Sequence, residues 1–445
     1  MAPRFGTDGV RGVANDELTP DIALALGRAA VEVLGRRRFA IGRDTRRSGP
    51  MLESALVAGI CSAGADVELL GVVPTPAVAW AAARGNGPGA MISASHNPFA
   101  DNGIKLFAAG GAKLADEVEA EIEAHYHAAL HRPAAPGPTG AALGTVVPTV
   151  GVDGWAEAVA GTIQPGGLRS MTVAVDCANG AATGWAARIL SDLGATVHVI
   201  GDDPDGVNIN DGYGSTDPTR LMAAVVEVGA DAGLAFDGDA DRLIAVDETG
   251  AIVDGDRVLA ILAGDWSDRG RLRANTVVVT VMTNLGFHLA MERAGITVIS
   301  TAVGDRYVLK ALDEHRLSLG GEQSGHVICR DLATTGDGIL TGVQLLDVVA
   351  RAGQPLSKLA SDAMTTVPQV LRNVRLPVRD ATLVGRLSDD IAAAEAELAS
   401  EGRVLVRASG TEPLLRIMVE HLDRTVADRT CDRLIAAAER LIGAG

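Results

Sequence analysis

The sequence lacks any apolar run long enough to cross a membrane. No stretch approaches the ~20 uninterrupted apolar residues that a spanning helix requires, and the run at residues 277–282 suffices only for a buried strand. The first residues, Met-Ala-Pro-Arg-Phe, show no apolar segment of the kind found in signal peptides. Both absences predict a cytoplasmic protein with no membrane partner.

Cysteine, lysine and positive charge are also scarce. The four cysteines lie far apart and form no Cys-x-x-Cys pair, which gives no support for structural zinc or a disulfide framework and suits a reducing compartment. Only four of the 39 basic residues are lysines, and 56 acidic residues bring the net charge to −17. A negative field repels phosphate backbones, which argues against nucleic acid as a partner, although a few focused arginines can still bind a phosphorylated metabolite.

The composition is that of a large globular protein. Of the 445 residues, 47% are hydrophobic and 21% charged, which excludes a disordered chain and predicts two to four domains. A first helix is predicted from Pro20, capped by Thr19, to Gly35. Short apolar runs then alternate with helical segments, at residues 39–42, 66–71 and 90–93. This alternation predicts βαβ units and a largely parallel sheet.

Further α/β regions follow a stretch rich in proline and glycine, residues 132–141, which we interpret as a linker. Strands of a second region are predicted at 172–176, 196–200 and 233–237, and those of a third at 243–246, 276–282, 296–301 and 317–320. The C-terminal part differs, with strands at 367–376, 403–407 and 414–420 and helices at 383–400 and 425–442. The chain is therefore predicted to be α/β: three similar α/β domains with mixed, mostly parallel sheets, and a C-terminal α+β domain.

An acidic cluster, Asp237, Asp239 and Asp241, follows one of the predicted strands. In an extended loop, residues two apart point to the same side, so three carboxylates would converge. Such a cluster is unfavourable unless a cation neutralises it, and hard oxygen ligands favour Mg²⁺ or Ca²⁺. The alternative interpretation is a solvated acidic turn.

Two further clusters also follow apolar strands. Ser95 precedes His96 and Asn97-Pro98, with Lys105 a few residues on, which predicts a nucleophile or a phosphate carrier; the alternative is a turn in which serines act as caps. The segment 320–326 contains Glu322, Ser324 and His326. A carboxylate and a hydroxyl two residues apart suit sugar hydroxyls, and the alternative is a turn with a structural histidine.

Near the C-terminus, two arginines flank a polar loop. Guanidinium groups, hydroxyls and free backbone amides together can bind phosphate, and this set comprises Arg407, Ser409, Gly410, Thr411 and Arg416. A surface hairpin with solvated arginines is the alternative. Two more arginine-bearing loops, residues 5–12 and 42–46, could be structural, with arginine paired to aspartate. Phosphoryl transfer on a sugar phosphate would use all four clusters.

Six motifs occur between residues 5 and 413, in the order FGTDGVRG, ISASHNP, DNGIK, DGDADR, GEQSGH and SGTEP. In these motifs and in their order, the chain resembles the α-D-phosphohexomutase superfamily. GEQSGH, with NIN at 208–210 and GST at 214–216, is similar to the branch that acts on glucosamine phosphates. The phosphoglucomutase/phosphomannomutase branch remains the alternative. Ala408 stands where many relatives have proline, which leaves the phosphate loop less rigid.

The resemblance implies four domains around a central cleft: a phosphoserine-loop domain (1–140), a metal-binding domain (141–247), a sugar-binding domain (248–362) and a phosphate-binding domain (363–445). It implies that Ser95 is carried as phosphoserine. It implies Mg²⁺ held by Ser95, Asp237, Asp239 and Asp241; catalysis by Ser95, Lys105, His326 and Arg11; substrate binding by Arg242, Glu322 and Ser324; and phosphate binding by Arg407, Ser409, Gly410, Thr411 and Arg416.

The implied reaction is the isomerisation of glucosamine 6-phosphate to glucosamine 1-phosphate for peptidoglycan precursor synthesis, a step of amino sugar metabolism. Glucosamine 1,6-bisphosphate would be both intermediate and activator. Two other classes remain open: a metal-dependent phosphatase, with water as the final acceptor, and a non-catalytic binder of sugar phosphates. The sequence leaves undecided whether the protein is a monomer or a dimer, and whether a kinase or autophosphorylation first modifies Ser95.

Overall fold

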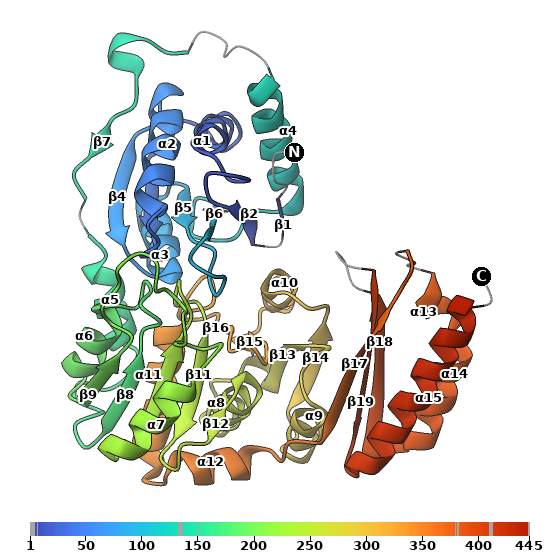
Figure 1. Ribbon diagram of the computed structural model, residues 1–445. Helices are drawn as coiled ribbons and strands as arrows, with labels where there is room; N and C mark the ends of the chain where they lie inside the picture. The colour runs from blue at the N-terminus through green and yellow to red at the C-terminus, as the bar shows by residue number, and fades with distance from the viewer. Residues whose placement is uncertain are drawn as a thin grey trace. The chain divides into compact units, whose positions relative to one another are not determined.

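The computed structural model describes residues 5–6, 8–131, 137–149, 151–378, 380, 382–408 and 413–443 (Figure 1). The chain divides into two compact units. The first comprises Met1–Met282 and Gly295–Ala363, and the second Thr283–Ala294 and Met364–Gly445. In the described part of the chain, no helix is long and apolar enough to cross a membrane. All four cysteines are free.

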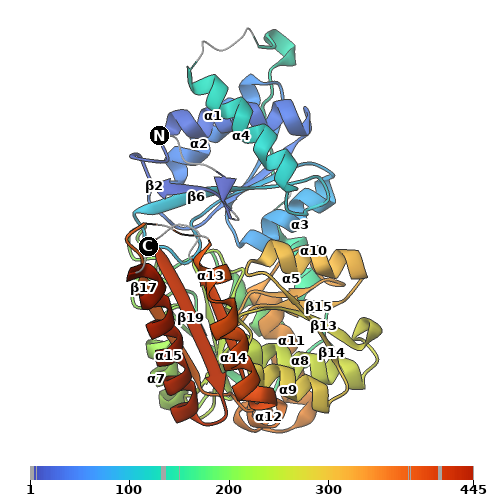
Figure 2. The ribbon, with the colours of Figure 1, turned by 90° about the vertical axis from the view of Figure 1, so that its right-hand side faces the viewer.

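The first sheet has seven strands in the order β1-β2-β6-β5-β3-β4-β7. Its elements are β1 (Phe5–Gly6), β2 (Gly9–Val13), α1 (Pro20–Leu34), β3 (Phe39–Arg43), α2 (Gly49–Ser62), β4 (Val67–Val72), α3 (Thr75–Gly85), β5 (Gly89–Ile92), β6 (Asp101–Phe107), α4 (Asp116–His131) and β7 (Val146–Val147). Helices α1, α2 and α4 lie on one face and α3 on the other (Figure 2). The core packs between the sheet and the first of these helical layers.

Local signals placed α1 correctly. Thr19 accepts a hydrogen bond from the Ile22 amide (3.4 Å), Pro20 is the first residue, and Gly35 ends the helix at φ 86°. The sheet is more mixed than predicted, because β3, β4, β5 and β7 run parallel whereas β6 pairs antiparallel with β5 and β2. The motif at 101–105 therefore lies in strand β6, which follows β5 after a short loop and pairs with it antiparallel. Part of the predicted linker, residues 132–136, lies outside the described residues.

The second sheet has the order β12-β11-β10-β8-β9. Its elements are α5 (Asp153–Ala160), β8 (Thr172–Asp176), α6 (Trp185–Asp192), β9 (Thr196–Ile200), α7 (Thr219–Val228), β10 (Ala232–Phe236), β11 (Leu243–Asp247) and β12 (Ile252–Val253). Assigning residues 243–246 to a third region was wrong. The turn at 237–242 reverses the chain, so β11 pairs antiparallel with β10 in the second sheet.

The third sheet has the order β14-β13-β15-β16. The strands of this sheet and the helices that accompany them are α8 (Gly255–Asp268), β13 (Thr276–Thr280), β14 (Thr297–Thr301), α10 (Asp305–His315), β15 (Leu319–Gly321), β16 (Val327–Cys329), α11 (Gly338–Ala352) and α12 (Leu356–Ala363). The β13–β14 and β13–β15 pairs are parallel, so the carboxyl ends of these strands share one edge. Asp305 and Glu322 follow β14 and β15 at that edge.

The C-terminal unit is an antiparallel sheet, β17-β19-β18, with α14 and α15 on one face (Figures 1 and 2). Its elements are α9 (Leu285–Arg293), β17 (Gln369–Arg375), α13 (Leu383–Arg386), α14 (Ser388–Leu398), β18 (Gly402–Ala408), β19 (Leu414–His421) and α15 (Arg424–Gly443). The single helix predicted at 383–400 is two, separated at Leu387. Glu420 accepts hydrogen bonds from Asn284 Nδ2 (2.9 Å) and the Leu285 amide (3.0 Å), which attaches α9 to this unit.

Candidate active site

Ser95 occupies a tight turn just beyond the end of β5. The Asn97 amide donates to the Ala94 carbonyl (3.1 Å), and Ser95 has φ 53°, a left-handed conformation that is costly for a residue with a Cβ. The Ser95 amide donates to Ser93 Oγ (2.9 Å), and Ser95 Oγ donates to Asp237 Oδ2 (2.5 Å). The turn therefore directs the buried hydroxyl at the acidic cluster.

Arg46 stabilises this turn through hydrogen bonds to its backbone carbonyls. Its side chain is 0% exposed and forms an ion pair with Asp44 (2.8 Å). The guanidinium donates to the carbonyls of Ser95 (2.9 Å) and Asn97 (2.8 Å), and also to those of Pro98 and Asp101. The arginine–aspartate pairing predicted for the 42–46 loop is thus present, and it supports the serine turn.

The three aspartates converge as predicted, but not through an extended loop. One oxygen of each carboxylate lies within 4.8 Å of the others, and all three side chains are buried. The segment is a turn, in which the Ala240 amide donates to the Asp237 carbonyl (3.0 Å) and Ala240 has φ 58°. The extended loop that alternation predicted is therefore wrong, because a hydrogen-bonded turn gathers the carboxylates.

The cluster fits a hard cation. Asp239 Oδ1 is buried and accepts no hydrogen bond from the described residues, while Asp239 Oδ2 accepts from Thr75 Oγ1 (2.6 Å). Burial, followed by the charges of Asp239 and Asp241, raises the pKa of Asp237 well above its usual value. Buried like charges at this separation call for a neutralising ion, and carboxylate oxygens are the donors that Mg²⁺ and Ca²⁺ prefer.

Cationic side chains flank the cluster. Lys105 Nζ lies 3.3 Å from Asp241 Oδ2 and 3.9 Å from Asp239 Oδ2. His326 lies between two carboxylates, 3.5 Å from Asp241 and 3.3 Å from Asp305. Burial alone would raise the pKa of Asp241, but Lys105 and His326 outweigh it and hold that pKa well below its usual value. Burial would lower the pKa of His326, yet Asp241 and Asp305 raise it.

A polar cavity opens beside these groups. Its wall includes ten residues from four of the predicted motifs, from the β14–α10 loop and from the start of α10: Asp8, Arg11, Ser95, Asp241, Arg242, Val303, Gly304, Asp305, Glu322 and His326. Glu322 Oε1 accepts from the Gly304 amide (3.0 Å), which fixes its carboxylate at the rim. Ser324 is exposed and is not part of this wall, because the Gly325 amide bonds to the Glu322 carbonyl and forms a turn.

Two residues beside the cavity were not predicted from the sequence as site residues, Asp305 and Lys113. Asp305 begins α10, contacts His326 and forms an ion pair with Lys113, whose Nζ also lies 4.0 Å from Asp8. Acidic and basic side chains therefore alternate from Asp241 through His326, Asp305 and Lys113 to Asp8. A sequence signal existed for Asp305, because Gly304-Asp305 follows an apolar strand as the other motifs do. Lys113 gave none.

The predicted phosphate loop lies in the C-terminal unit. Arg407 on β18 and Arg416 on β19 are directly opposite each other in the sheet. Burial, followed by the charge of Arg416, lowers the pKa of Arg407. Two like charges at facing positions are unfavourable and would be relieved by an anion. Ser409, Gly410 and Thr411 lie outside the described residues.

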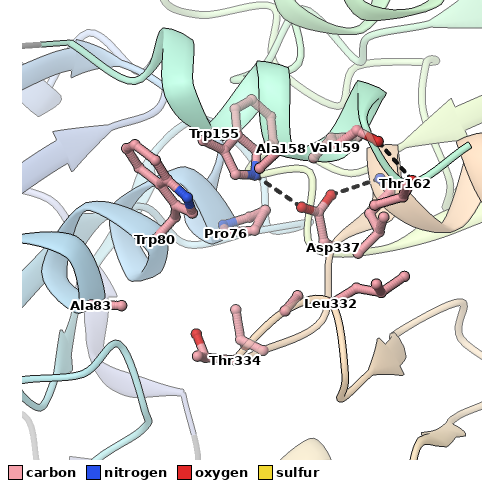
Figure 3. A pocket seen from close by; sticks show the side chains of 13 residues that line it. Pro76, Trp80, Ala83, Trp155, Ala158, Val159, Thr162, Leu332, Thr334 and Asp337 are labelled. Atoms are coloured by element: carbon pink, nitrogen blue, oxygen red, sulfur yellow. Dashed lines mark hydrogen bonds between the residues drawn. The ribbon is translucent and has the colours of Figure 1, made fainter. Parts of the chain in front are cut away.

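A second, apolar pocket is lined by residues of α3, α5 and α11 (Figure 3), and two of these helices contact the aspartate turn, residues 237–242. Its wall includes Trp80, Trp155 and Asp337, and Trp155 Nε1 donates to Asp337 Oδ2 (3.0 Å). The helices on either side begin at the turn: the Thr75 amide of α3 donates to the Asp239 carbonyl (2.9 Å), and the Gly338 amide of α11 to that of Ala240 (3.0 Å). The pocket walls thus support the acidic turn.

Family models for all four domains of one fold match the chain. They are described as phosphoglucomutase/phosphomannomutase alpha/beta/alpha domain I (residues 2–132), domain II (153–250), domain III (254–367) and the C-terminal domain (366–437). The chain therefore belongs to the phosphoglucomutase/phosphomannomutase family. This match confirms both the predicted superfamily and the predicted α/β fold class.

Curated relatives define the branch more closely. A phosphoglucosamine mutase of Rhodococcus jostii is 52% identical over 444 residues, which cover 98% of each chain. That of Frankia alni is 52% identical over 459 aligned positions that cover both chains entirely. Among solved structures, a phosphoglucomutase/phosphomannomutase family protein from Burkholderia thailandensis superposes with a TM-score of 0.81 at 26% identity, covering 99% of this chain and 98% of that one.

Proposed function

We propose that this enzyme interconverts glucosamine 6-phosphate and glucosamine 1-phosphate through a phosphoserine at Ser95. One observation carries the proposal: Ser95 Oγ lies 2.5 Å from Asp237 Oδ2, beside a buried cluster of three aspartates that could hold a metal ion. A carrier hydroxyl and a cation site in contact are what phosphoryl transfer needs. The full-length similarity to phosphoglucosamine mutases supports glucosamine as the sugar.

In the proposed transfer, the free hydroxyl of the sugar phosphate attacks the seryl phosphorus. A phosphorus–oxygen bond forms to the sugar, the bond to Ser95 Oγ breaks, and the hydroxyl proton ends on Ser95 Oγ. The 1,6-bisphosphate reorients, and its other phosphoryl group returns to Ser95 by the same exchange. Asp237, Asp239 and Asp241 would hold Mg²⁺ together with an oxygen of the seryl phosphate. The bound ion supplies neutralisation of the negative charge that develops on the transferring group.

The remaining roles follow the positions of the side chains. Lys105, His326 and Arg11 are the candidates for orienting the attacking hydroxyl and for moving its proton, since each lies at the cluster or the cavity wall. Arg242 and Glu322, on the same wall, would bind the sugar phosphate. Ser324 remains a predicted contact to the sugar hydroxyls.

Phosphate binding is proposed for the C-terminal unit, through Arg407 and Arg416 with Ser409, Gly410 and Thr411. The facing arginines support this proposal, because an anion bound between them would relieve their mutual repulsion and could accept hydrogen bonds from both guanidinium groups. The four-domain division at residues 140, 247 and 362 remains part of the proposal. The protein is proposed to act in the cytoplasm.

Two measurements test the function. A coupled assay over glucosamine, glucose and mannose 6-phosphates should give the highest kcat/KM with glucosamine 6-phosphate. Phosphatase-treated enzyme should be nearly inactive until a hexose or glucosamine 1,6-bisphosphate restores a single phosphate, followed by intact mass. Release of free phosphate in place of isomerised product would establish a phosphatase instead. Full turnover by the dephosphorylated protein without bisphosphate would refute the relay through Ser95.

A further inference from the structure

The NIN segment at residues 208–210 marks the branch in the sequence but has no role in the proposed reaction. In the structure this segment lies between β9 and α7, beside the serine turn of the first sheet. Asn210 Nδ2 donates to the Ser95 carbonyl (2.9 Å) and to the Asn97 carbonyl (3.0 Å). The amide thus reaches across from the second sheet's domain and bonds to the backbone of the carrier residue itself.

These two carbonyls are the same ones that Arg46 binds from the other side. Arg46 contributes 2.9 and 2.8 Å contacts, so each carbonyl accepts one donor from its own domain and one from Asn210. The turn that carries the three aspartates, residues 237–242 and here called the metal turn, lies on a third side, because a Cβ added to Gly238 would lie 2.5 Å from the Ser95 carbonyl oxygen and 3.0 Å from Asn210 Nδ2. The serine turn, the NIN segment and the metal turn therefore meet at one carbonyl oxygen.

Asn210 is itself held in place. Its backbone N–H donates to the Ala178 carbonyl (2.9 Å). Its φ of 60° lies in the left-handed region, which asparagine tolerates better than most residues. Nearby contacts fasten the same two domains: Thr45 Oγ1 donates to the Asn179 carbonyl (2.5 Å) and the Arg47 amide to that of Gly206 (2.9 Å). The side-chain amide of Asn210 is thus presented from a fixed backbone.

We infer that Asn210 is a positioning residue, which holds the left-handed turn of Ser95 so that its Oγ points at the metal turn. Ser95 is costly to keep at φ 53°, and two donors on its carbonyl stabilise that conformation. The inference rests on the proposed function, because a turn held in this way matters only if Ser95 Oγ carries the phosphoryl group. Asn210 is not among the residues that line the polar cavity, so we expect it to act through Ser95.

Asn210→Asp tests this directly. Aspartate keeps the shape and tolerates positive φ, but it presents an oxygen to two carbonyls in place of the amide protons. We expect kcat to fall about 10- to 100-fold, since misplacement of a reacting group by about 1 Å can cost 10²-fold, while KM stays within about twofold. Asn210→Gly also keeps the φ and removes the donor without adding charge, and it should lower kcat about tenfold.

Asn208→Asp is the matched control. Asn208 lies in the same motif and is also half-buried, but among the described residues its side chain bonds only within its own loop, to the Asp203 carbonyl and the Asp205 amide. This variant should retain wild-type kcat. Equal losses in the Asn208 and Asn210 variants would overturn the inference, as would a loss confined to Asn210→Asp with Asn210→Gly unaffected, which would make charge the cause.

Two readouts besides turnover separate positioning from general damage. Intact mass should show dephosphorylated Asn210→Asp regaining phosphate from glucose 1,6-bisphosphate more slowly than wild type, by the factor lost in kcat. Hydrogen exchange should rise in peptides that cover residues 93–105. Wild-type rates in the variants would refute the role of Asn210. If the wild-type protein itself takes up no phosphate on Ser95, the proposed function fails instead.

Discussion

Replacing Arg46 by methionine should destabilise the first unit far more than any surface change. The guanidinium is 0% exposed and pairs with an equally buried Asp44 (2.8 Å). Methionine fills most of the volume but leaves the Asp44 carboxylate without its cation, and it removes donors from the carbonyls of Pro98 and Asp101. Those of Ser95 and Asn97 keep the Asn210 amide.

The expected loss is about 3–5 kcal/mol, the range for breaking a buried ion pair by removing one partner. Asp44 can limit this loss by taking up a proton. Burial already raises its pKa, against the opposing effect of Arg46, and without Arg46 the folded-state pKa rises further above the unfolded value of about 3.9. A raised folded-state pKa means that the native state binds the proton more readily, so the deficit of Arg46→Met should shrink as pH falls from 8 toward 5.

Tryptophan fluorescence in urea can measure this, because all four tryptophans, Trp80, Trp155, Trp185 and Trp266, lie in the first unit. The double variant Asp44→Asn, Arg46→Met removes both charges, so it should recover about half of the loss and show no change of the deficit with pH. Arg38→Met, at an exposed position, should lie within about 0.5 kcal/mol of wild type. A deficit below about 1 kcal/mol for Arg46→Met, or one equal at pH 5 and pH 8, would refute the reasoning.

Three further variants test the proposed site. Ser95→Ala should fold normally but lose nearly all turnover, since the proposed transfer passes through the Ser95 hydroxyl; retention of more than about a tenth of kcat, a deficit under ~1.4 kcal/mol, would exclude Ser95 as carrier. Asp239→Asn should weaken Mg²⁺ binding in titration calorimetry and lower kcat, and unchanged activity at limiting Mg²⁺ would contradict the assignment. Arg416→Ala should mainly raise KM in both reaction directions, because the non-reacting phosphate is bound before and during chemistry; a fall in kcat alone would argue against that role.

Several features could be predicted because their causes are local. The cap at Thr19 and the proline after it define the start of α1 within one turn. The apolar runs at 172–176 and 196–200 coincide with β8 and β9, since short buried strands carry their own composition. The aspartate cluster was also correctly predicted to converge, although the reason given, an extended loop, was wrong.

Other features depend on contacts between distant segments. Strand β6 returns antiparallel to β5, and α9 joins the C-terminal unit through Glu420, which lies more than a hundred residues away in the chain. Ser324 follows Glu322 by two residues, yet a turn places it at the surface rather than in the cavity wall. Alternation along a strand predicts side-chain direction only where the backbone is extended, and in these loops hydrogen bonds set the direction instead.

By itself the sequence determined which chemical groups are present and which strands they follow, because residue type, capping and strand composition are properties of short segments. Only the tertiary structure decided that Ser95 Oγ bonds to Asp237, 142 positions further along, and that Arg46 and Asn210 share the two carbonyls of its turn. Those contacts join four separate loops. Their geometry follows from how the first two sheets pack and from the buried polar atoms that this packing obliges to find partners.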